Sequence, residues 1–314
     1  MSMNAPSPET PLRIGTRGSP LALAQAHETR TRLAEVFELP AEAFDIVVIK
    51  TTGDRVLDRP LKDIGGKGLF TREIEDDLLS GDIDIAVHSM KDMPTVQPGG
   101  LVIDCMLPRE DTRDALVSLS GIGFDAIPEG AVVGTSSLRR RAQLLHRRPD
   151  LTAVEFRGNV QTRLRKLEDG LAVCTFLAQA GLNRLGLSEV AASPINTDSM
   201  LPAIAQGAIG IERRVEDHRA AAMLEAIHDT ETGVRLAAER EFLAGLDGSC
   251  ETPIAGLAEL DGHGIRLRGE ILRTDGTDVV ADEAHGDVSD AVALGADLAR
   301  RLLDRAGPDF FDWR

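Results

Sequence analysis

The sequence predicts two α/β domains followed by a smaller α+β domain, and three observations lead to this prediction. Short apolar strands alternate with amphipathic helices through the first two thirds of the chain. A charged stretch that opens with a proline, residues 108–114, interrupts this alternation and indicates a crossing between domains. From about residue 230 the order becomes a helix, three strands with glycine-containing turns, and a closing helix.

The first α/β domain begins with a short apolar run at 12–15, which predicts a strand. Ser19 and Pro20 then predict the start of a helix, because serine caps helix N-termini and proline suits the first helical position. Further strands are predicted at 44–49, at 83–87 and at 101–107.

The second α/β domain has predicted strands at 131–134, 151–156 and 171–177, each leading into a helix. The helix after the second of these strands is expected to end at Gly170, since glycine commonly terminates helices. Where helices cover both faces of a sheet, ligands bind at the carboxyl ends of the strands. The polar motifs of this chain lie at such strand-to-helix junctions.

The last domain combines a predicted helix at 234–246 with strands at 254–260, 265–272 and 278–283. A helix at 289–305 closes the chain. Two helices on a small antiparallel sheet make an α+β domain.

Composition excludes several classes of protein. The chain has 314 residues and a formal net charge of −16, which argues against nucleic-acid binding because duplex affinity comes mainly from neutralised phosphates. No apolar stretch approaches the ~18 residues of a membrane span, so no membrane association is expected. Residues 1–10 lack the apolar core of a signal peptide and are interpreted as a disordered tail. We therefore expect a cytoplasmic protein.

The three cysteines show no paired pattern, which favours a reducing compartment. Cys105 and Cys174 lie in apolar runs and are interpreted as inert core residues. Cys250 lies between Gly248 and Pro253 in a predicted loop, so it is the cysteine expected to be exposed and reactive. No group of histidine, cysteine and aspartate has metal-ligand spacing, and no metal site is predicted.

One stretch of this acidic chain is strongly basic. From Arg139 to Lys166 there are nine basic and two acidic residues, a local charge of +7. A basic cluster on an acidic protein indicates a specific site for a ligand with several negative charges. Arginine also presents a planar fork that matches the geometry of a carboxylate or a phosphate, which lysine does not.

Arg139 and Arg140 are expected in the first turn of the helix that follows residues 134–137. The free N–H groups and the macrodipole of such a helix start attract anions, and arginine there opposes the dipole unless an anion lies beside it. The alternative is a surface helix with solvated arginines.

Two further junctions have a similar composition. Arg163 follows the next strand, after Asn159, with Arg157 just before the turn. Arg17 and Ser19 lie at the first junction of the chain, where simple helix capping by the serine is the alternative.

Residues 88–92 follow a predicted strand and include an aspartate suited to acid–base chemistry. Asp92 could also stabilise a cationic intermediate, while Lys91 could bind a carboxylate and Ser89 could hydrogen-bond to it. The alternative is an ordinary polar loop. His88 is interpreted as a structural histidine.

A glycine-rich segment lies in a long polar connection of the first domain. It contains Gly65, Gly66 and Gly68 around Lys67. This composition predicts a flexible loop or lid, and the spacing of a P-loop is absent.

Seven segments and one cysteine together resemble the porphobilinogen deaminase family, also called hydroxymethylbilane synthases. The segments are RIGTRGSPLALAQA (13–26), GGKGLF (65–70), DIAVHSMKDMP (84–94), GTSSLRR (134–140), RGNVQTRLRKL (157–167), AGLNRLG (180–186) and LPAIAQGAIGIE (201–212), and the cysteine is Cys250. The match runs in order from about residue 12 to the C-terminus.

The resemblance implies two periplasmic-binding-protein-like α/β domains and a smaller α+β domain that carries the cofactor cysteine. It places domain 1 at 11–107 with 208–225, domain 2 at 113–201 and domain 3 at 230–314. The return of the chain to domain 1 follows from the resemblance alone.

The resemblance also implies an enzyme, a transferase of porphyrin, haem and other tetrapyrrole biosynthesis. The family joins porphobilinogen units head to tail, with loss of ammonia, into the linear tetrapyrrole hydroxymethylbilane. It does so on a dipyrromethane cofactor bound through a thioether, which by the motif match is attached to Cys250.

Each pyrrole ring carries an acetate and a propionate, so the resemblance assigns carboxylate binding to the basic residues of the junctions. The cofactor-binding residues that it implies are Cys250, Ser89, Lys91, Arg139, Arg140, Arg163 and Arg184, and the substrate-binding residues are Arg17, Ser19, Arg157 and Lys67. Asp92 matches the catalytic aspartate of the family.

Two positions depart from the family pattern. Ala172, Val173 and Cys174 stand where the family often has a Tyr-Asp-Ala strand, and Ala205 stands where glycine is usual. We interpret both departures as packing changes.

The alternative function is a non-catalytic anion-binding protein of the solute-receptor type. The missing signal peptide, Asp92 and Cys250 argue against it. A monomer is expected, because no apolar interface stripe is obvious.

Overall fold

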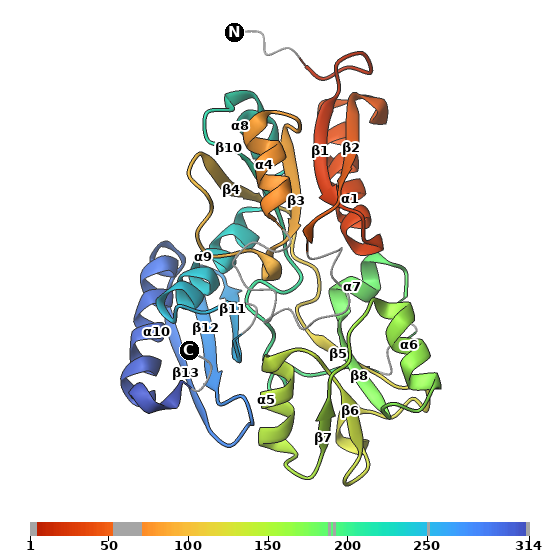
Figure 1. The fold of residues 1–314 in the computed structure, drawn as a ribbon. Coiled ribbons are helices and arrows are strands. Elements are labelled where there is room, and N and C mark those ends of the chain that lie inside the picture. Colours follow the sequence, from red (N-terminus) through yellow and green to blue (C-terminus); the bar gives the residue numbers. More distant parts are fainter. Residues whose placement is uncertain (1–4, 53–70, 188–189, 191–192, 250–251, 312–314) are drawn as a thin grey trace. The chain divides into compact units, whose positions relative to one another are not determined.

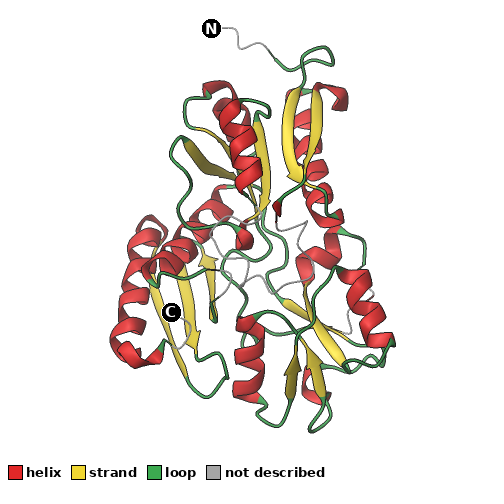
Figure 2. Ribbon diagram, viewed as in Figure 1, coloured by secondary structure: helices red, strands yellow, loops and turns green. Residues whose placement is uncertain are grey.

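The computed structural model, drawn in Figures 1 and 2, describes residues 5–52, 71–187, 190, 193–249 and 252–311. The chain divides into two units. Unit 1 comprises Met1–Arg109 and Ala208–Gly233, and unit 2 comprises Glu110–Gly207 and Val234–Arg314. Unit 1 is thus built from two separate stretches of the chain. None of the helices in the described part of the chain has the length and apolarity that a bilayer crossing requires.

Unit 1 contains a mixed five-stranded sheet with the order β2-β1-β3-β10-β4. The strands are β1 (Leu12–Arg17), β2 (Phe44–Ile49), β3 (Ile85–Ser89), β4 (Leu101–Met106) and β10 (Ile209–Arg214). β1 runs parallel to both β2 and β3, whereas β10 runs antiparallel to both β3 and β4. The parallel strands β1 and β3 therefore end side by side at one edge of the sheet.

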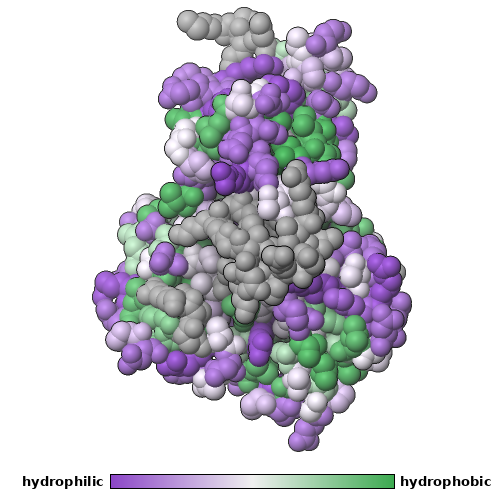
Figure 3. Space-filling view, viewed as in Figure 1, coloured by the Kyte–Doolittle hydropathy of each residue, from purple (hydrophilic) through white to green (hydrophobic). Residues whose placement is uncertain are grey.

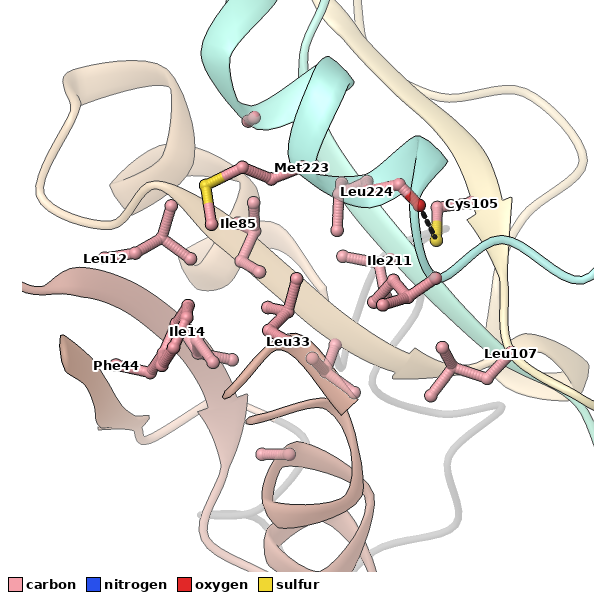
Figure 4. Close-up of a cluster of buried hydrophobic side chains, with 14 of the residues drawn as sticks. Leu12, Ile14, Leu33, Phe44, Ile85, Cys105, Leu107, Ile211, Met223 and Leu224 are labelled. Atoms are coloured by element: carbon pink, nitrogen blue, oxygen red, sulfur yellow. Dashed lines mark hydrogen bonds between the residues drawn. The ribbon is translucent and has the colours of Figure 1, made fainter. Parts of the chain in front are cut away.

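Helices cover both faces of this sheet, so four successive side chains of β3, from Ile85 to His88, are buried. Leu33 of α1 (Pro20–Phe37) and Leu224 of α8 (His218–Glu225) pack with Ile14 and Ile85 in one cluster, most of which Figure 4 shows. On the other face, α4 (Arg72–Ser80) packs against the sheet through a second cluster. Short 3-10 turns lie at Ala41–Ala43 and Met90–Asp92.

Unit 2 contains a second mixed five-stranded sheet with the order β7-β6-β8-β5-β9. The strands are β5 (Asp114–Val117), β6 (Val132–Gly134), β7 (Thr152–Val154), β8 (Cys174–Ala178) and β9 (Ser193–Pro194). Its helices are α5 (Leu138–Arg147), α6 (Val160–Glu168) and α7 (Gln179–Arg184), with a 3-10 turn at Phe124–Ala126. α5 packs on one face, with α6 and α7 on the other.

The rest of unit 2 is a three-stranded antiparallel sheet, β11 (Ile254–Asp261), β12 (Gly264–Leu272) and β13 (Val279–Asp287). The accompanying helices are α9 (Thr230–Gly245) and α10 (Ala291–Ala306), with 3-10 turns at Val288–Asp290 and Pro308–Phe310. Phe242 of α9 lies so close to Gly269 of β12 that a Cβ there would come within 2.5 Å of the ring.

The predicted succession of two α/β sheets and one α+β sheet is confirmed, while several elements differ from the prediction. β5 and β10 were not predicted. β5 follows directly on a charged stretch, and β10 is recognisable as a strand only from its pairing with β3 and β4. The strand predicted at 171–177 is observed at Cys174–Ala178, since Leu171 and Val173 are exposed at 56% and 41%. Val173 is therefore a surface residue rather than a packing residue.

Candidate active site

In unit 1, polar side chains gather where β1 and β3 end. Ser19 caps α1 by accepting a hydrogen bond from the N–H of Ala22 at 3.2 Å, which confirms the predicted helix start. At the end of β3 the chain turns through Met90–Asp92, so that Asp92 lies exposed just beyond the sheet. Neighbouring parallel strands thus deliver Arg17 and Asp92 to the same edge.

These residues line a small cavity, which we call the unit 1 cavity, of about 70 Å³. Its polar lining includes Arg17, Ser19, Gln25, His88, Ser89 and Asp92. Lys91 is half-buried in the same turn as Asp92. The structure therefore brings together the predicted residues of two junctions that are distant in the sequence.

Gln25 belongs to this site although no role was predicted for it. It is only 3% exposed, and its side-chain amide both donates to and accepts from the Ser89 hydroxyl, at 2.8 and 3.0 Å. This pair links α1 to the end of β3 beside Asp92. The available signal was a glutamine among the apolar residues of the predicted helix.

In unit 2, Arg139 and Arg140 lie in the first turn of α5, where Ser137 caps the helix. The two arginines are only 4% and 7% exposed, so the alternative of solvated surface arginines is wrong. A buried guanidinium needs a compensating charge. Asp114 at the start of β5, fully buried, supplies one.

Asp114 holds both arginines. Its Oδ1 accepts hydrogen bonds from Nε and Nη2 of Arg140, at 3.1 and 2.7 Å, and from Nε2 of Gln206 at 2.9 Å. Its Oδ2 lies 2.8 Å from Nη2 of Arg139. Burial alone would raise the pKa of Asp114, but the charges of Arg139 and Arg140 outweigh it and hold that pKa below its ordinary value. No role for Asp114 or Gln206 was predicted from the sequence.

Arg163 adds a third guanidinium to this group. Its Nη1 donates to the carbonyl oxygen of Phe176 at 3.1 Å, and Nη1 of Arg140 donates to the same oxygen at 2.9 Å. Its Nε donates to the carbonyl oxygen of Gly158. Burial, followed by repulsion from Arg140, lowers the pKa of Arg163 to about 10. We call Arg139, Arg140 and Arg163 the unit 2 arginine cluster.

The unit 2 arginine cluster has more positive charge than its carboxylate partner can neutralise. Among the described residues, Asp114 is the carboxylate that pairs directly with Arg139 and Arg140, while Arg163 donates to carbonyl oxygens, so three guanidinium groups have one carboxylate in direct contact. The Nε of Arg139 is also buried and has no hydrogen-bond partner in the described part of the chain. An anionic ligand would satisfy both conditions.

Arg157 and Arg184 have other contacts. Nε of Arg157 forms an ion pair with the exposed Glu155 at 2.8 Å. Nη2 of Arg184 donates to the carbonyl oxygen of Gly207 at 3.1 Å. Gly207 has a φ of 88°, and a Cβ on it would lie 2.5 Å from the carbonyl oxygen of Glu110, so this position requires glycine.

Lys67 and Cys250 lie outside the described residues. The other two cysteines are buried, and burial raises the pKa of each thiol to about 12. The prediction that Cys105 and Cys174 are inert core residues is therefore confirmed. No group of three histidine, cysteine or acidic side chains within the described ranges is arranged to hold a metal ion.

Comparison with known protein families shows to which family this chain belongs. Residues 12–222 match the family model described as porphobilinogen deaminase, dipyromethane cofactor binding domain, and residues 234–304 match the C-terminal domain of the same family. The chain belongs to the porphobilinogen deaminase family. The predicted resemblance is thereby confirmed.

Curated members of the porphobilinogen deaminase family resemble the chain over almost its whole length. A porphobilinogen deaminase of Paracoccus denitrificans is 68% identical over 308 residues, which cover 98% of each chain. A chloroplastic porphobilinogen deaminase of Pisum sativum is 54% identical and covers 96% of this chain and 83% of its own. Among solved structures, a TRAP periplasmic solute binding protein from Desulfovibrio salexigens matches 71% of this chain and 73% of its own, with 11% identity and a TM-score of 0.41.

The residues present fit the dipyrromethane cofactor of the porphobilinogen deaminase family. Each of its two rings carries an acetate and a propionate, so the cofactor is a polyanion. The charge excess of the unit 2 arginine cluster and the unpartnered Nε of Arg139 are what such a ligand would satisfy. Both lie within residues 12–222, the part of the chain that matches the cofactor-binding domain.

Proposed function

We propose that this chain joins porphobilinogen units head to tail, with loss of ammonia, into hydroxymethylbilane, on a dipyrromethane bound through a thioether to Cys250. Family membership makes the chain an enzyme, a transferase of tetrapyrrole biosynthesis. The observation that carries the proposal is the unit 2 arginine cluster, in which three guanidinium groups gather while, among the described residues, one carboxylate, that of Asp114, pairs directly with them. A solute receptor without catalysis is not supported, since the family is enzymatic.

The proposed roles of the basic residues follow from the acidic side arms of the ligands. The proposed cofactor-binding residues are Cys250, Ser89, Lys91, Arg139, Arg140, Arg163 and Arg184, and the proposed substrate-binding residues are Arg17, Ser19, Arg157 and Lys67. When bound, the cofactor would supply a tethered pyrrole as the point to which substrate units are joined. Arg163 supports this assignment best, because its hydrogen-bond partners among the described residues are carbonyl oxygens, which accept its protons without neutralising its charge.

Asp92 is the proposed catalytic residue. Loss of ammonia from the aminomethyl group of porphobilinogen leaves a cation whose charge is delocalised onto the pyrrole nitrogen. The carboxylate of Asp92 lines the unit 1 cavity at the end of β3, beside the hydrogen-bonded pair of Gln25 and Ser89. An oriented carboxylate can accept the pyrrole N–H and stabilise the cation, and it can exchange protons with the substrate.

Arg17 and Ser19 line the same cavity as Asp92 and are proposed to hold the acidic side arms of the substrate. A cation and a hydroxyl at a helix start provide donors for a carboxylate. Binding of these side arms would orient the aminomethyl group toward Asp92. Orientation of this kind lowers the entropic part of the barrier.

Intact mass spectrometry of the purified protein tests the proposal. We expect a mass above that of the sequence by one dipyrromethane, and a pink colour with an acidic aldehyde reagent for pyrroles. A Cys250→Ser variant should show the mass of its sequence alone and no turnover. An active protein with an unmodified Cys250 would overturn the proposal.

We also propose that the enzyme is a cytoplasmic monomer. The large hydrophobic residues that are exposed in the described part of the chain are scattered over many elements; they include Val36, Leu79, Val96, Leu119, Val215 and Val292. On the face drawn in Figure 3, hydrophobic residues form small groups separated by hydrophilic ones. Light scattering coupled to gel filtration should give the mass of one chain; a dimer mass would refute the monomer.

A further inference from the structure

Unit 1 contains a group of three buried titratable side chains, of which His88 lines the unit 1 cavity. They are His88 of β3, Glu212 of β10 and Glu75 of α4, which are 6%, 0% and 8% exposed. Nε2 of His88 lies 3.0 Å from Oε2 of Glu212 and donates a hydrogen bond when it carries the proton. In the antiparallel register Gly210 faces His88, so Glu212 lies two residues further on and on the same face.

Burial acts on the charges of this group. Burial raises the pKa of Glu75, and the charge of Glu212 raises it further, against the opposing effects of Thr71 and His88. The Oε1 of Glu212 is buried and has no hydrogen-bond partner among the described residues. Buried charges are costly unless they are paired, and the contact between His88 and Glu212 pairs two of these three side chains.

His88 connects this group to the unit 1 cavity, because its side chain lines that cavity together with Asp92 and Arg17. A polar cavity of about 70 Å³ has room for several water molecules. Water can bridge groups that do not touch, at little cost compared with a direct hydrogen bond. A proton can therefore pass between the Asp92 side of the cavity and the imidazole.

The reaction requires such a passage in every cycle. The substrate ammonium leaves as ammonia, the attacked methylene carbon forms a bond to the pyrrole carbon, and that pyrrole carbon loses its hydrogen as a proton. Ammonia finally takes up this proton, so each step releases one ammonium ion and consumes no other reactant. Between these events a side chain at the site can hold the proton.

We propose that His88, backed by Glu212 and Glu75, is a positioning residue that receives this proton from Asp92 through cavity water and so resets Asp92 for the next condensation. This inference rests on the proposed function. The charged groups that face His88 are Glu212 from β10, Glu75 from α4, and Asp92 and Arg17 across the cavity.

The decisive variant is Glu212→Gln, which preserves the shape of the side chain and removes its charge. Initial rates of ammonia release from pH 5 to pH 10 should show kcat reduced about 100-fold, the lower end of a general acid–base contribution. KM should stay within about twofold, because Glu212 does not touch the substrate. The acid limb of the kcat profile should move to lower pH, since the imidazole loses the negative charge that favours its protonated form.

Asp84→Asn is the matched control, because Asp84 precedes the same strand and pairs with Arg13 at 2.9 Å. This variant should lower the stability of the protein without moving the acid limb of the kcat profile. An unchanged limb in Glu212→Gln, or a limb that moves equally in the control, overturns the inference. Should Glu212→Gln fail to fold, Glu75→Gln must show the same shift of the limb or the inference fails. If the wild-type protein carries no dipyrromethane or releases no ammonia, the proposed function itself is refuted.

Discussion

Replacement of Asp114 by asparagine tests the charge balance of the unit 2 arginine cluster. The two side chains have the same shape, but the amide has no charge and only one oxygen. In the wild type, Oδ1 accepts three hydrogen bonds and Oδ2 lies 2.8 Å from Nη2 of Arg139. If the amide oxygen keeps the bonds from Arg140 and Gln206, the amide NH2 group must face the N–H groups of Arg139.

The expected cost is large, because both arginines remain buried without their counter-charge. Removing one partner of a buried ion pair costs about 3–5 kcal/mol. For a unit of this size, each kcal/mol lost from the free energy of unfolding lowers Tm by about 2–4 °C. The Tm of unit 2 should therefore fall by about 6–20 °C. Calorimetry and urea unfolding at pH 7 measure this difference.

Asp111→Asn is the matched control. Asp111 pairs with Arg113 at 2.6 Å, but that arginine is 44% exposed, and surface pairs contribute about 0–1 kcal/mol. A cost for Asp114→Asn as small as that of the control would refute the charge balance that we infer.

The same variant gives a pH dependence with a definite sign. The folded state lowers the pKa of Asp114, so its stabilising contribution is complete above the unfolded pKa of about 3.9 and is lost as the pH falls through the folded pKa. The stability difference between wild type and Asp114→Asn should therefore be constant between pH 7 and pH 5 and should narrow below about pH 4. A difference that grows on acidification contradicts this assignment.

Three further predictions concern single side chains. Asp92→Ala should abolish ammonia release while intact mass still shows the dipyrromethane; near-normal kcat would refute its role. Arg163→Leu should abolish dipyrromethane attachment, seen by mass, yet change the stability of the cofactor-free protein by less than about 1 kcal/mol, because only carbonyl oxygens lose a donor. Ala205→Gly should stabilise the protein by about 0.5–1 kcal/mol in urea unfolding, because Ala205 has a φ of 59°; a loss of stability would contradict this.

The role of Ala205 corrects the interpretation drawn from the sequence. The substitution of the usual glycine was interpreted as a packing change, whereas its consequence is a strained backbone. The left-handed conformation is stabilised by Glu239, whose Oε2 accepts from the N–H of Ala205 at 2.7 Å while its Oε1 accepts from the N–H of Ala258 at 2.8 Å. A motif shows which residue has changed, but the φ angle shows what the change does.

The sequence by itself determined features that depend on neighbouring residues. The helix starts at Ser19, Ser137 and Asn159 were predictable, because a capping side chain bonds to an N–H three residues ahead. Apolar runs likewise marked Cys105 and Cys174 as buried. Short-range patterns of this kind depend on local geometry, which the sequence contains.

Only the tertiary structure decided which charges meet. Asp114 and Arg140 are 26 residues apart in sequence, and His88 and Glu212 are 124 apart. These pairs exist because β5 lies beside β8, and β10 beside β3, and no local pattern specifies such strand neighbours. The sequence therefore revealed that arginines gather, while the long-range pairing of strands determined which of them are buried and which carboxylates accompany them.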